Sequence, residues 1–222
     1  MTGNDTQVKA MTILERLAAG DLLISDGATG TYLQQHGLEP GGCPEEFNAS
    51  HPDVVEGMAK AYFDAGSDMV LTNTFGGSRF MQRKYGYESR VSEFNRLAAE
   101  QAKSQAPDSN HYAVGSIGPT GEFLEPLGAV SDSEMYDSMT EQITALVEGG
   151  ADAILMETQM AIEEAIIGVK AAKDNTDLPV IATMVFDKGP RGFFTMMGVT
   201  PEQAVTGLRG AGADIVGANC GN

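Results

Sequence analysis

Several residue types are scarce in this 222-residue chain, and each scarcity excludes a class of protein. Tryptophan is absent and aromatic residues make up 7% of the chain, so neither a carbohydrate platform nor a base-stacking surface is indicated. Lysine and arginine number 14 against 31 acidic residues, which gives a formal net charge of -17. Nucleic-acid and anionic-membrane binding are therefore disfavoured, because phosphate contacts need clustered basic side chains.

Long apolar runs and cysteines are also lacking. No apolar run approaches the roughly 20 residues that a membrane-spanning helix needs, so no membrane association is expected. Cys43 and Cys220 are the only cysteines, which form no disulfide framework and make a reducing, cytoplasmic location the expectation. No low-complexity linker divides the chain, so residues 1–222 are expected to form one domain.

A short pattern occurs three times and indicates the architecture. It reads AGSDMVLTNT from Ala65, GGADAILMET from Gly149 and AGADIVGANC from Ala211. Each copy has a glycine suited to the end of a helix, then an apolar run typical of a strand that is buried on both faces. Each copy ends in a polar pair. The pattern predicts helix–strand units of a parallel sheet.

The remaining segments extend this alternation along the whole chain. Beginning after an N-terminal helix, the expected strands lie near 21–28, 68–74, 111–118, 152–158, 178–186 and 213–220, and the expected helices at 52–65, 91–106, 132–149, 161–174 and 201–210. Thr200, Pro201 and Glu202 are suited to the first positions of the last helix.

Two architectures fit six βα units in strict alternation: an open doubly wound sheet and a (β/α)8 TIM barrel that lacks its last one or two strands. Polar residues follow every expected strand, and a barrel would gather them all around one mouth. They are Asp26, Asn73, Thr74, Ser116, Glu157, Thr158, Asp187, Asn219 and Cys220. We therefore favour an α/β barrel, incomplete in this chain.

Five motifs at these strand ends carry a resemblance to a known family. In chain order they are DGATGT (26–31), NTFGGSR (73–79), GSIGPTGEFLEPLG (115–128), METQ (156–159) and GANCG (217–221). Together they closely resemble the homocysteine S-methyltransferase family, and most of all the homocysteine-binding module of cobalamin-dependent methionine synthases and related corrinoid-linked methyltransferases. Betaine–homocysteine methyltransferases look like more distant relatives.

The resemblance implies a (β/α)8 barrel with one Zn²⁺ held by three cysteine thiolates. The first ligand of the family follows the sixth strand in an Asn-Cys pair, which Cys220 matches. The other two form a Cys-Cys pair that this sequence does not contain, and Cys43 matches no family ligand. The zinc site is therefore expected to be incomplete in this chain, whether it is a fragment, a truncated product or one piece of a protein completed by another chain.

The resemblance also implies a thiol substrate, homocysteine or a relative, methylated to give methionine. By this resemblance the DGATGT turn and the fourth-strand glutamate are expected to bind substrate. With neighbouring strand-end residues, the expected substrate-binding residues are Asp26, Gly27, Ala28, Thr29, Asn73, Glu157 and Asn219. Asp26 could instead fix its own turn. One departure is visible, since Ser116 stands where the family often has an aspartate, and this leaves the thiol open.

Alternatives remain at this point. The chain could be a non-catalytic binding subunit that keeps the barrel scaffold, or a methyltransferase component that acts with a corrinoid protein or another methyl-donor domain. A less favoured reading is an open-sheet enzyme with a phosphate-bearing substrate. A barrel that lacks strands also leaves open edges, through which the chain could self-associate. The methyl donor is not readable from these residues.

Overall fold

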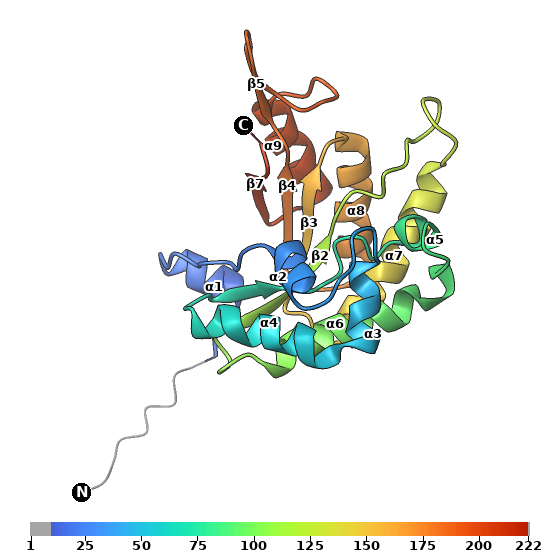
Figure 1. Cartoon of the computed structure of the whole chain (residues 1–222). Helices are drawn as coiled ribbons and strands as arrows, with labels where there is room; N and C mark the ends of the chain where they lie inside the picture. Colours follow the sequence, from blue (N-terminus) through green and yellow to red (C-terminus); the bar gives the residue numbers. More distant parts are fainter. Residues whose placement is uncertain (1–9, 222) are drawn as a thin grey trace, which may run out of the picture.

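A parallel five-stranded sheet forms the centre of the molecule in the computed structural model, which describes residues 10–221 (Figure 1). Residues 1–9 and 222 of the expected domain lie outside this description. The strands are β1 (Met69–Leu71), β2 (Tyr112–Ile117), β3 (Ala153–Gln159), β4 (Val180–Met184) and β7 (Ile215–Ala218). They pair in the order β1-β2-β3-β4-β7, every pair parallel. This is the expected consecutive arrangement of a barrel that remains open.

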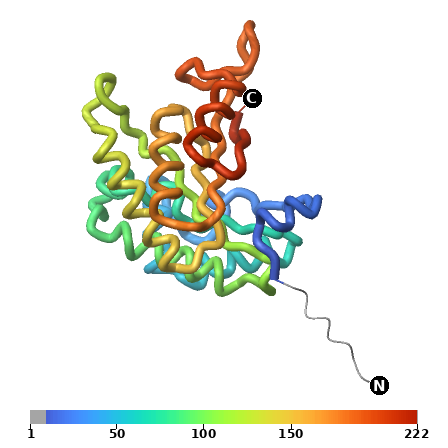
Figure 2. Tube along the Cα trace, turned by 180° about the vertical axis from the view of Figure 1, so that it is seen from behind, coloured from blue at the N-terminus to red at the C-terminus, as the bar shows by residue number. Residues whose placement is uncertain are grey.

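Long helices alternate with the strands and cover the outer face of the sheet. They are α4 (Pro52–Asp64), α6 (Val91–Ser104), α7 (Asp132–Glu148), α8 (Ile162–Asn175) and α9 (Pro201–Ala211). Neighbouring helices α6, α7, α8 and α9 contact one another in sequence, and Figure 2 shows the row from behind. The expected helices at 52–65, 91–106, 132–149, 161–174 and 201–210 are thereby confirmed within a few residues.

Shorter elements occupy the connections. They are α1 (Ile13–Ala18), α2 (Thr29–Gln35), η1 (Pro44–Glu46), α3 (Phe47–Ser50), α5 (Arg79–Arg83) and η2 (Glu88–Arg90), with a hairpin of β5 (Asp187–Gly189) and β6 (Gly192–Phe194). The hairpin was not expected from the sequence, where this segment reads as a loop after a strand.

The predicted helix ends are confirmed by local geometry. Thr200 caps α9 through the N–H of Gln203, and Pro201 is its first residue. Ser131 caps α7 in the same way through Glu134. The glycine of each repeated pattern follows a helix with positive φ, 102° at Gly66, 90° at Gly150 and 110° at Gly212. A side chain at such a backbone conformation would be strained, which explains why the pattern repeats a glycine there.

The strand expected near 21–28 is wrong in extent. Only Ser25 forms a bridge, with Met69 of β1, although the N–H of Asp26 and the carbonyl of Ile24 also bond to the backbone of β1. Leu22 is 86% exposed and Ile24 55% exposed. The segment has no second neighbour to bury these side chains, so the apolar pattern alone does not make a full strand here.

The two faces of the sheet differ in how completely they are covered. Between the sheet and α7, α8 and α9 lies the main core, which includes the fully buried Met139, Ile154, Met156 and Met184. On the other face a small cluster of Ile13, Tyr112, Val114 and Ala153 is flanked by partly buried side chains such as Leu71, Leu155 and Ile215. This second face is the inner surface of an open barrel. In the part of the chain that is described, no helix combines the length and the apolar character needed to cross a bilayer.

Candidate active site

A cavity of about 440 Å³ lies at the carboxyl ends of the strands. Its wall combines the turn before α2, the loop after β1, single residues near the ends of β2 and β3, and one residue after β7. The expected site residues among its lining are Gly27, Ala28, Thr29, Asn73, Glu157 and Cys220. Residues as far apart in the sequence as Gly27 and Cys220 therefore line one cavity, because parallel strands bring their carboxyl ends to the same edge of a sheet.

Glu157 is the half-buried carboxylate of this cavity. It belongs to β3, and its Oε1 accepts a hydrogen bond from the hydroxyl of Ser116 on the neighbouring β2, at 2.5 Å. Its Oε2 accepts a weaker bond from Thr158 at 3.3 Å. Ser116, which stands where the family often has an aspartate, donates this bond and so orients Glu157. The exchange also removes one negative charge from the site.

Asp26 lies behind the turn and binds the adjacent strand. Its carboxylate accepts the N–H of Leu71 at 2.8 Å and the hydroxyl of Ser25 at 3.1 Å. Burial raises the pKa of Asp26 to about 6, and the negative charge of Glu157 adds to the increase. These bonds tie Asp26 to β1 and to Ser25, and the structure places a second carboxyl group near Glu157.

The turn that follows Asp26 lines the cavity with residues 27–30 and leads into a helix. Ala28 is the N-cap of α2 and makes no side-chain capping bond. The first N–H groups of a helix have no partner within the helix. Gly27 is needed for close approach, since a Cβ there would lie 3.1 Å from the hydroxyl of Tyr62, which itself bonds the carbonyl of Ala28 at 2.8 Å.

Two asparagines predicted at the site are held by the scaffold. Asn73 is 4% exposed, and its amide nitrogen bonds the carbonyl of Pro44 at 2.7 Å and Asn48 Oδ1 at 2.8 Å. Asn219 accepts the N–H of Thr158 at 3.1 Å and the hydroxyl of Thr183 at 2.9 Å. Its amide nitrogen bonds Thr158 Oγ1 at 2.8 Å. Asn219 therefore ties the ends of β3, β4 and β7 together.

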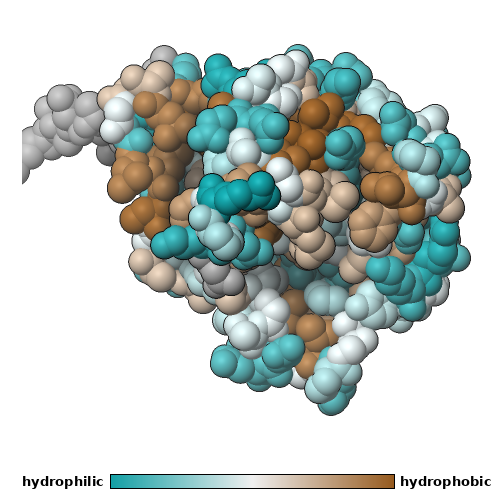
Figure 3. Space-filling view, turned by 90° about the horizontal axis from the view of Figure 1, so that it is seen from above, coloured by the Kyte–Doolittle hydropathy of each residue, from teal (hydrophilic) through white to brown (hydrophobic). Residues whose placement is uncertain are grey.

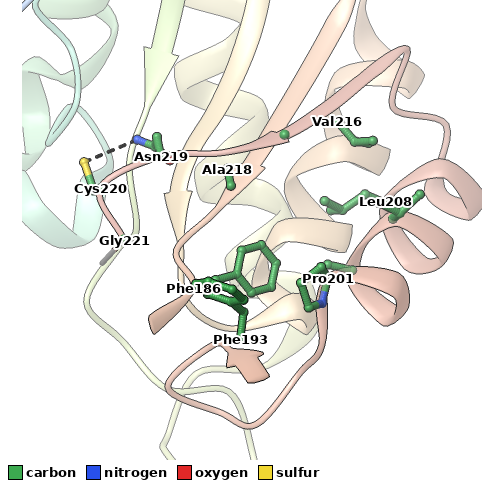
Figure 4. Close-up of a pocket in the computed structure, with 12 residues that line it drawn as sticks. Phe186, Phe193, Pro201, Leu208, Val216, Ala218, Asn219, Cys220 and Gly221 are labelled. Atoms are coloured by element: carbon green, nitrogen blue, oxygen red, sulfur yellow. Dashed lines mark hydrogen bonds between the residues drawn. The ribbon is translucent and has the colours of Figure 1, made fainter. Parts of the chain in front are cut away.

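Cys220 follows directly and is exposed. Its sulfur accepts a contact from Asn219 Nδ2 at 3.5 Å and a long one from Thr158 Oγ1 at 3.9 Å. Thr158 and Cys220 are the two non-glycine residues with positive φ in residues 10–221, at 59° and 56°. Figure 4 shows the Cys220 side chain turned away from Phe186 and Phe193.

A second, apolar groove of about 570 Å³ adjoins the site at Cys220. It runs between β7 and α9 and is lined by Phe186, Phe193, Pro201, Leu208 and Val216 (Figure 4). The segment 189–200 contributes Phe193 to this groove. The groove follows the free edge of β7.

The described residues do not form a complete metal site. In residues 10–221 no three His, Cys, Asp or Glu side chains are grouped as metal ligands. Cys43 is buried, and its one S–H is shared between two acceptors, Glu45 Oε2 at 3.4 Å and Gln82 Oε1 at 3.3 Å. Burial raises the pKa of the Cys43 thiol to about 11. Cys43 is therefore a buried thiol away from the proposed sulfur position, and Cys220 is left as the single thiol among the cavity residues.

Sequence reasoning missed one acidic residue of the cavity. Glu45 lines the cavity although it is only 2% exposed. It lies two residues after Cys43, in the segment GGCPEEFN. A signal was present, since two adjacent glutamates precede an apolar residue, but nothing in that pattern tells which of the two turns inward.

Comparison with known proteins agrees with the resemblance seen in the motifs. The family model for homocysteine S-methyltransferase matches residues 23–222. Methionine synthase of Mycobacterium tuberculosis is 32% identical over 238 aligned positions, which cover 99% of this chain and 19% of that protein. Betaine–homocysteine S-methyltransferase 1 of Sus scrofa is 30% identical over 213 positions, which cover 94% of this chain and 74% of that protein.

The fold is similar to a solved structure as well. The homocysteine methyltransferase MmuM from Escherichia coli, in its apo form, has a TM-score of 0.71 at 18% identity, over 92% of this chain and 74% of that one. A metallated form of the same protein is also similar, with a TM-score of 0.59. The chain spans about a fifth of the length of the methionine synthases that it matches.

Proposed function

This chain belongs to the homocysteine S-methyltransferase family, and on that premise we propose that it is the homocysteine-binding part of an enzyme that methylates homocysteine to methionine. One observation supports this above the others. A carboxylate, a thiol and a turn with unpartnered N–H groups line a single cavity, through Glu157, Cys220 and residues 27–29. These groups match the ammonium, sulfur and carboxylate of an amino-acid thiol.

The charge of the cavity favours an ammonium over a phosphate. Its charged lining residues within the described chain are Glu45 and Glu157, with no lysine or arginine among them. A phosphate would find no cationic partner there, which argues against the phosphate-bearing alternative. We propose that Glu157 receives the substrate ammonium, with Asp26 close behind, and that the N–H groups of Gly27, Ala28 and Thr29 receive its carboxylate.

The sulfur end is assigned to the side of the cavity that Cys220 lines. A free thiol has a pKa near ~8.5 and is mostly protonated at neutral pH, whereas the thiolate is the nucleophile. Zinc, when bound, deprotonates a coordinated thiol and can leave one position open for substrate. We propose Cys220 as one zinc ligand. Catalytic zinc sites use three protein ligands, so the lone Cys220 thiol of residues 10–221 does not fit a complete site.

The methyl donor belongs to the same proposal. We propose that it is carried by a corrinoid protein or by another donor domain, outside this chain. The much greater length of the methionine synthases supports such a division of labour. The apolar groove beside Cys220 adds support, because it offers a bulky apolar partner a surface next to the proposed sulfur position.

Binding of the product tests the assignment of the amino-acid end. We expect methionine to bind the chain measurably by calorimetry, and Glu157→Gln to weaken the affinity about 10- to 100-fold, the usual effect of losing a charged hydrogen-bond partner. Glu163→Gln serves as the matched control, since Glu163 is exposed outside this cavity. Equal affinity of the wild-type chain and Glu157→Gln would refute the role of Glu157.

Metal analysis after dialysis tests the assignment of the sulfur end. We expect the 222-residue chain to retain less than one equivalent of zinc, and Cys220→Ala to alter little, because one thiolate does not make a tight site. In a longer protein that supplies the remaining ligands, the same substitution is expected to abolish zinc retention and methyl transfer. Tight stoichiometric zinc in the 222-residue chain would contradict this assignment.

A further inference from the structure

The loop after β1, residues 73–77, forms one wall of the cavity. Hydrogen bonds from the rest of the chain to its backbone hold it in place. All five of its carbonyls accept hydrogen bonds from partners outside the loop, and that of Gly76 is described below. The other four bonds are Asn48 Nδ2 to Asn73 at 2.9 Å, Gln142 Nε2 to Thr74 at 2.8 Å, Gly118 N to Phe75 at 2.9 Å and Asn95 Nδ2 to Gly77 at 2.9 Å. The three amide side chains are at most 1% exposed. A loop on a protein surface rarely has so many buried partners.

Within this loop, Gly76 is held by side chains through both its N–H and its carbonyl. Its N–H donates to Glu45 Oε1 at 2.7 Å, and its carbonyl accepts from Gln82 Nε2 at 2.8 Å. Gln82 Nε2 also donates to Glu45 Oε2 at 3.0 Å, which joins the two partners. The thiol of Cys43 donates to the same oxygen at 3.4 Å. We call Cys43, Glu45, Gly76 and Gln82 the Glu45 clamp.

The chemistry of the Glu45 clamp requires an acceptor with two oxygens. Both carboxylate oxygens of Glu45 receive hydrogens, from an N–H on one side and from an N–H and an S–H on the other. A glutamine has only one acceptor oxygen, and its NH₂ group would face a donor. Burial raises the pKa of Glu45, and the hydrogen bonds from Gly76, Cys43 and Gln82 offset only part of this increase. The residue is thus costly to bury and has no equivalent substitute.

What the loop presents to the cavity gives the Glu45 clamp its role. Phe75 is 44% exposed and lines the cavity next to Gly76. Its ring lies on Gly118, where an added Cβ would be 2.7 Å from the ring. An exposed aromatic ring on a loop so firmly fixed is a preformed apolar contact surface.

We propose that Glu45 is a positioning residue of the methyl-transfer site, which holds the peptide of Gly76 and so fixes Phe75 as an apolar wall against the bound amino-acid thiol or thioether. The inference rests on the proposed function for the identity of the ligand. Glu45 itself acts through the loop and touches no reacting atom. If Glu45 had a purely structural role, breaking the Glu45 clamp would leave ligand affinity unchanged.

The test compares Glu45→Gln with Glu46→Gln. Glu46 is the adjacent residue, and its carboxylate bonds the exposed Ser50. Amide exchange of Gly76 is followed by NMR and methionine affinity by calorimetry, at a temperature at which both variants are folded. In Glu45→Gln we expect Gly76 to exchange at least about 10-fold faster and methionine to bind about 10-fold more weakly, as the loss of one buried hydrogen bond implies. Glu46→Gln is expected to match the wild-type chain in both measurements.

A measurement on the wild-type chain covers the case in which Glu45→Gln does not fold. The rate at which a thiol reagent labels Cys43 reports on opening of the Glu45 clamp, and mass spectrometry separates its peptide from that of the exposed Cys220. We expect saturating methionine to slow the labelling of Cys43 several-fold.

The outcomes separate this inference from the proposed function. Faster exchange of Gly76 in Glu45→Gln with unchanged methionine affinity overturns the positioning role and leaves the proposed function intact. Labelling of Cys43 that is indifferent to methionine, in a chain that binds methionine, also overturns it. A wild-type chain that binds no methionine overturns the proposed function, and this inference with it.

Discussion

The two sides of the cavity are built on opposite principles. On the side of β1, buried amide side chains and Glu45 satisfy the peptide groups of loop 73–77, and the wall is complete within the chain. On the side of β7, Cys220 stands at the free edge of the sheet beside an apolar groove with exposed Phe193 and Val205. The β1 side of the cavity is therefore preformed, whereas the β7 side leaves apolar surface exposed.

Adding a methyl group to the tightly packed β1 side should have the largest effect on stability. A Cβ on Gly77 would lie 2.7 Å from Gln142 Nε2 and closer still to Asn95, both fully buried and hydrogen-bonded. We expect Gly77→Ala to lower the free energy of unfolding by about 2–4 kcal/mol, since overpacking and broken buried hydrogen bonds add. Denaturant titration measures it. A loss below about 1 kcal/mol would mean that this wall is less rigid than the structure implies.

Removing the buried charge of Asp26 should have the next largest effect. Burial raises the pKa of Asp26 from its ordinary value of 3.8 to about 6, so the folded state binds the proton more tightly than the unfolded state. The stability that this provides is fully present below pH 4 and is lost as the pH rises through 6. Asp26→Asn should therefore raise the free energy of unfolding at pH 8, by at most about 3 kcal/mol, from a shift of about two pKa units.

The same substitution should alter stability little below pH 4, which provides the internal control. Stability of Asp26→Asn and of the wild-type chain is measured by thermal unfolding across pH 4–8. If the wild-type chain is the more stable of the two at pH 8, then the hydrogen bond to Leu71 outweighs the cost of burying the charge, and the comparison between the two sides must be redrawn.

Changing the open side should affect association more than folding. The free edges of the sheet, with exposed Ile24 at one end and the β7 groove at the other, predict self-association. In Figure 3 apolar residues gather in patches on the face seen from above. We expect Val205→Lys to raise the dissociation constant of the self-associated form about 10-fold, because a charge would be buried at the contact.

Sedimentation over a range of concentrations measures the effect, with Thr206→Lys as the control. Thr206 is an exposed neighbour on α9. A wild-type chain that remains monomeric at every concentration would remove the β7 edge as an association surface.

The smallest expected effect is a gain in stability on the open side. Gly210 lies within α9, and an added Cβ there would meet no atom within 4 Å. Gly210→Ala should raise the free energy of unfolding by about 0.5–1 kcal/mol through helix propensity alone. Set beside Gly77→Ala, it tests whether the same chemical change has opposite signs on the two sides. A destabilised Gly210→Ala variant would indicate an unseen contact along α9.

Much of the fold could be predicted because each βα unit carries its own local signal. The repeated glycine–aspartate–apolar pattern located β1, β3 and β7, and the order of the units fixed a consecutive parallel sheet. The segment 21–28 failed for a physical reason. Leu22 and Ile24 have strand-like character, but a strand also needs neighbours, and these side chains remain exposed.

The site was predictable in its location and less so in its side-chain roles. The positions of Glu157, Asn73 and Cys220 at strand ends predicted that these residues would lie together at one end of the sheet. They did not tell that the amide groups of Asn73 and Asn219 would be engaged by the scaffold, because buried amides must find partners that are distant in sequence. Substrate contact by the remaining atoms of these residues stays a prediction. Glu45 was missed because its partners Gly76 and Gln82 lie 31 and 37 positions away.

The consecutive order of the strands also shapes how the protein can be made. Apart from the β5–β6 hairpin, each strand pairs with the strand that precedes it in the chain. During synthesis, a strand that leaves the ribosome can therefore add to a partner that is already in place, and no earlier pairing has to open. The nascent sheet grows at one edge only. Within residues 10–221 that edge is β7, so the surface that carries Cys220 is the last to form and the first at which folding errors would be exposed to other chains.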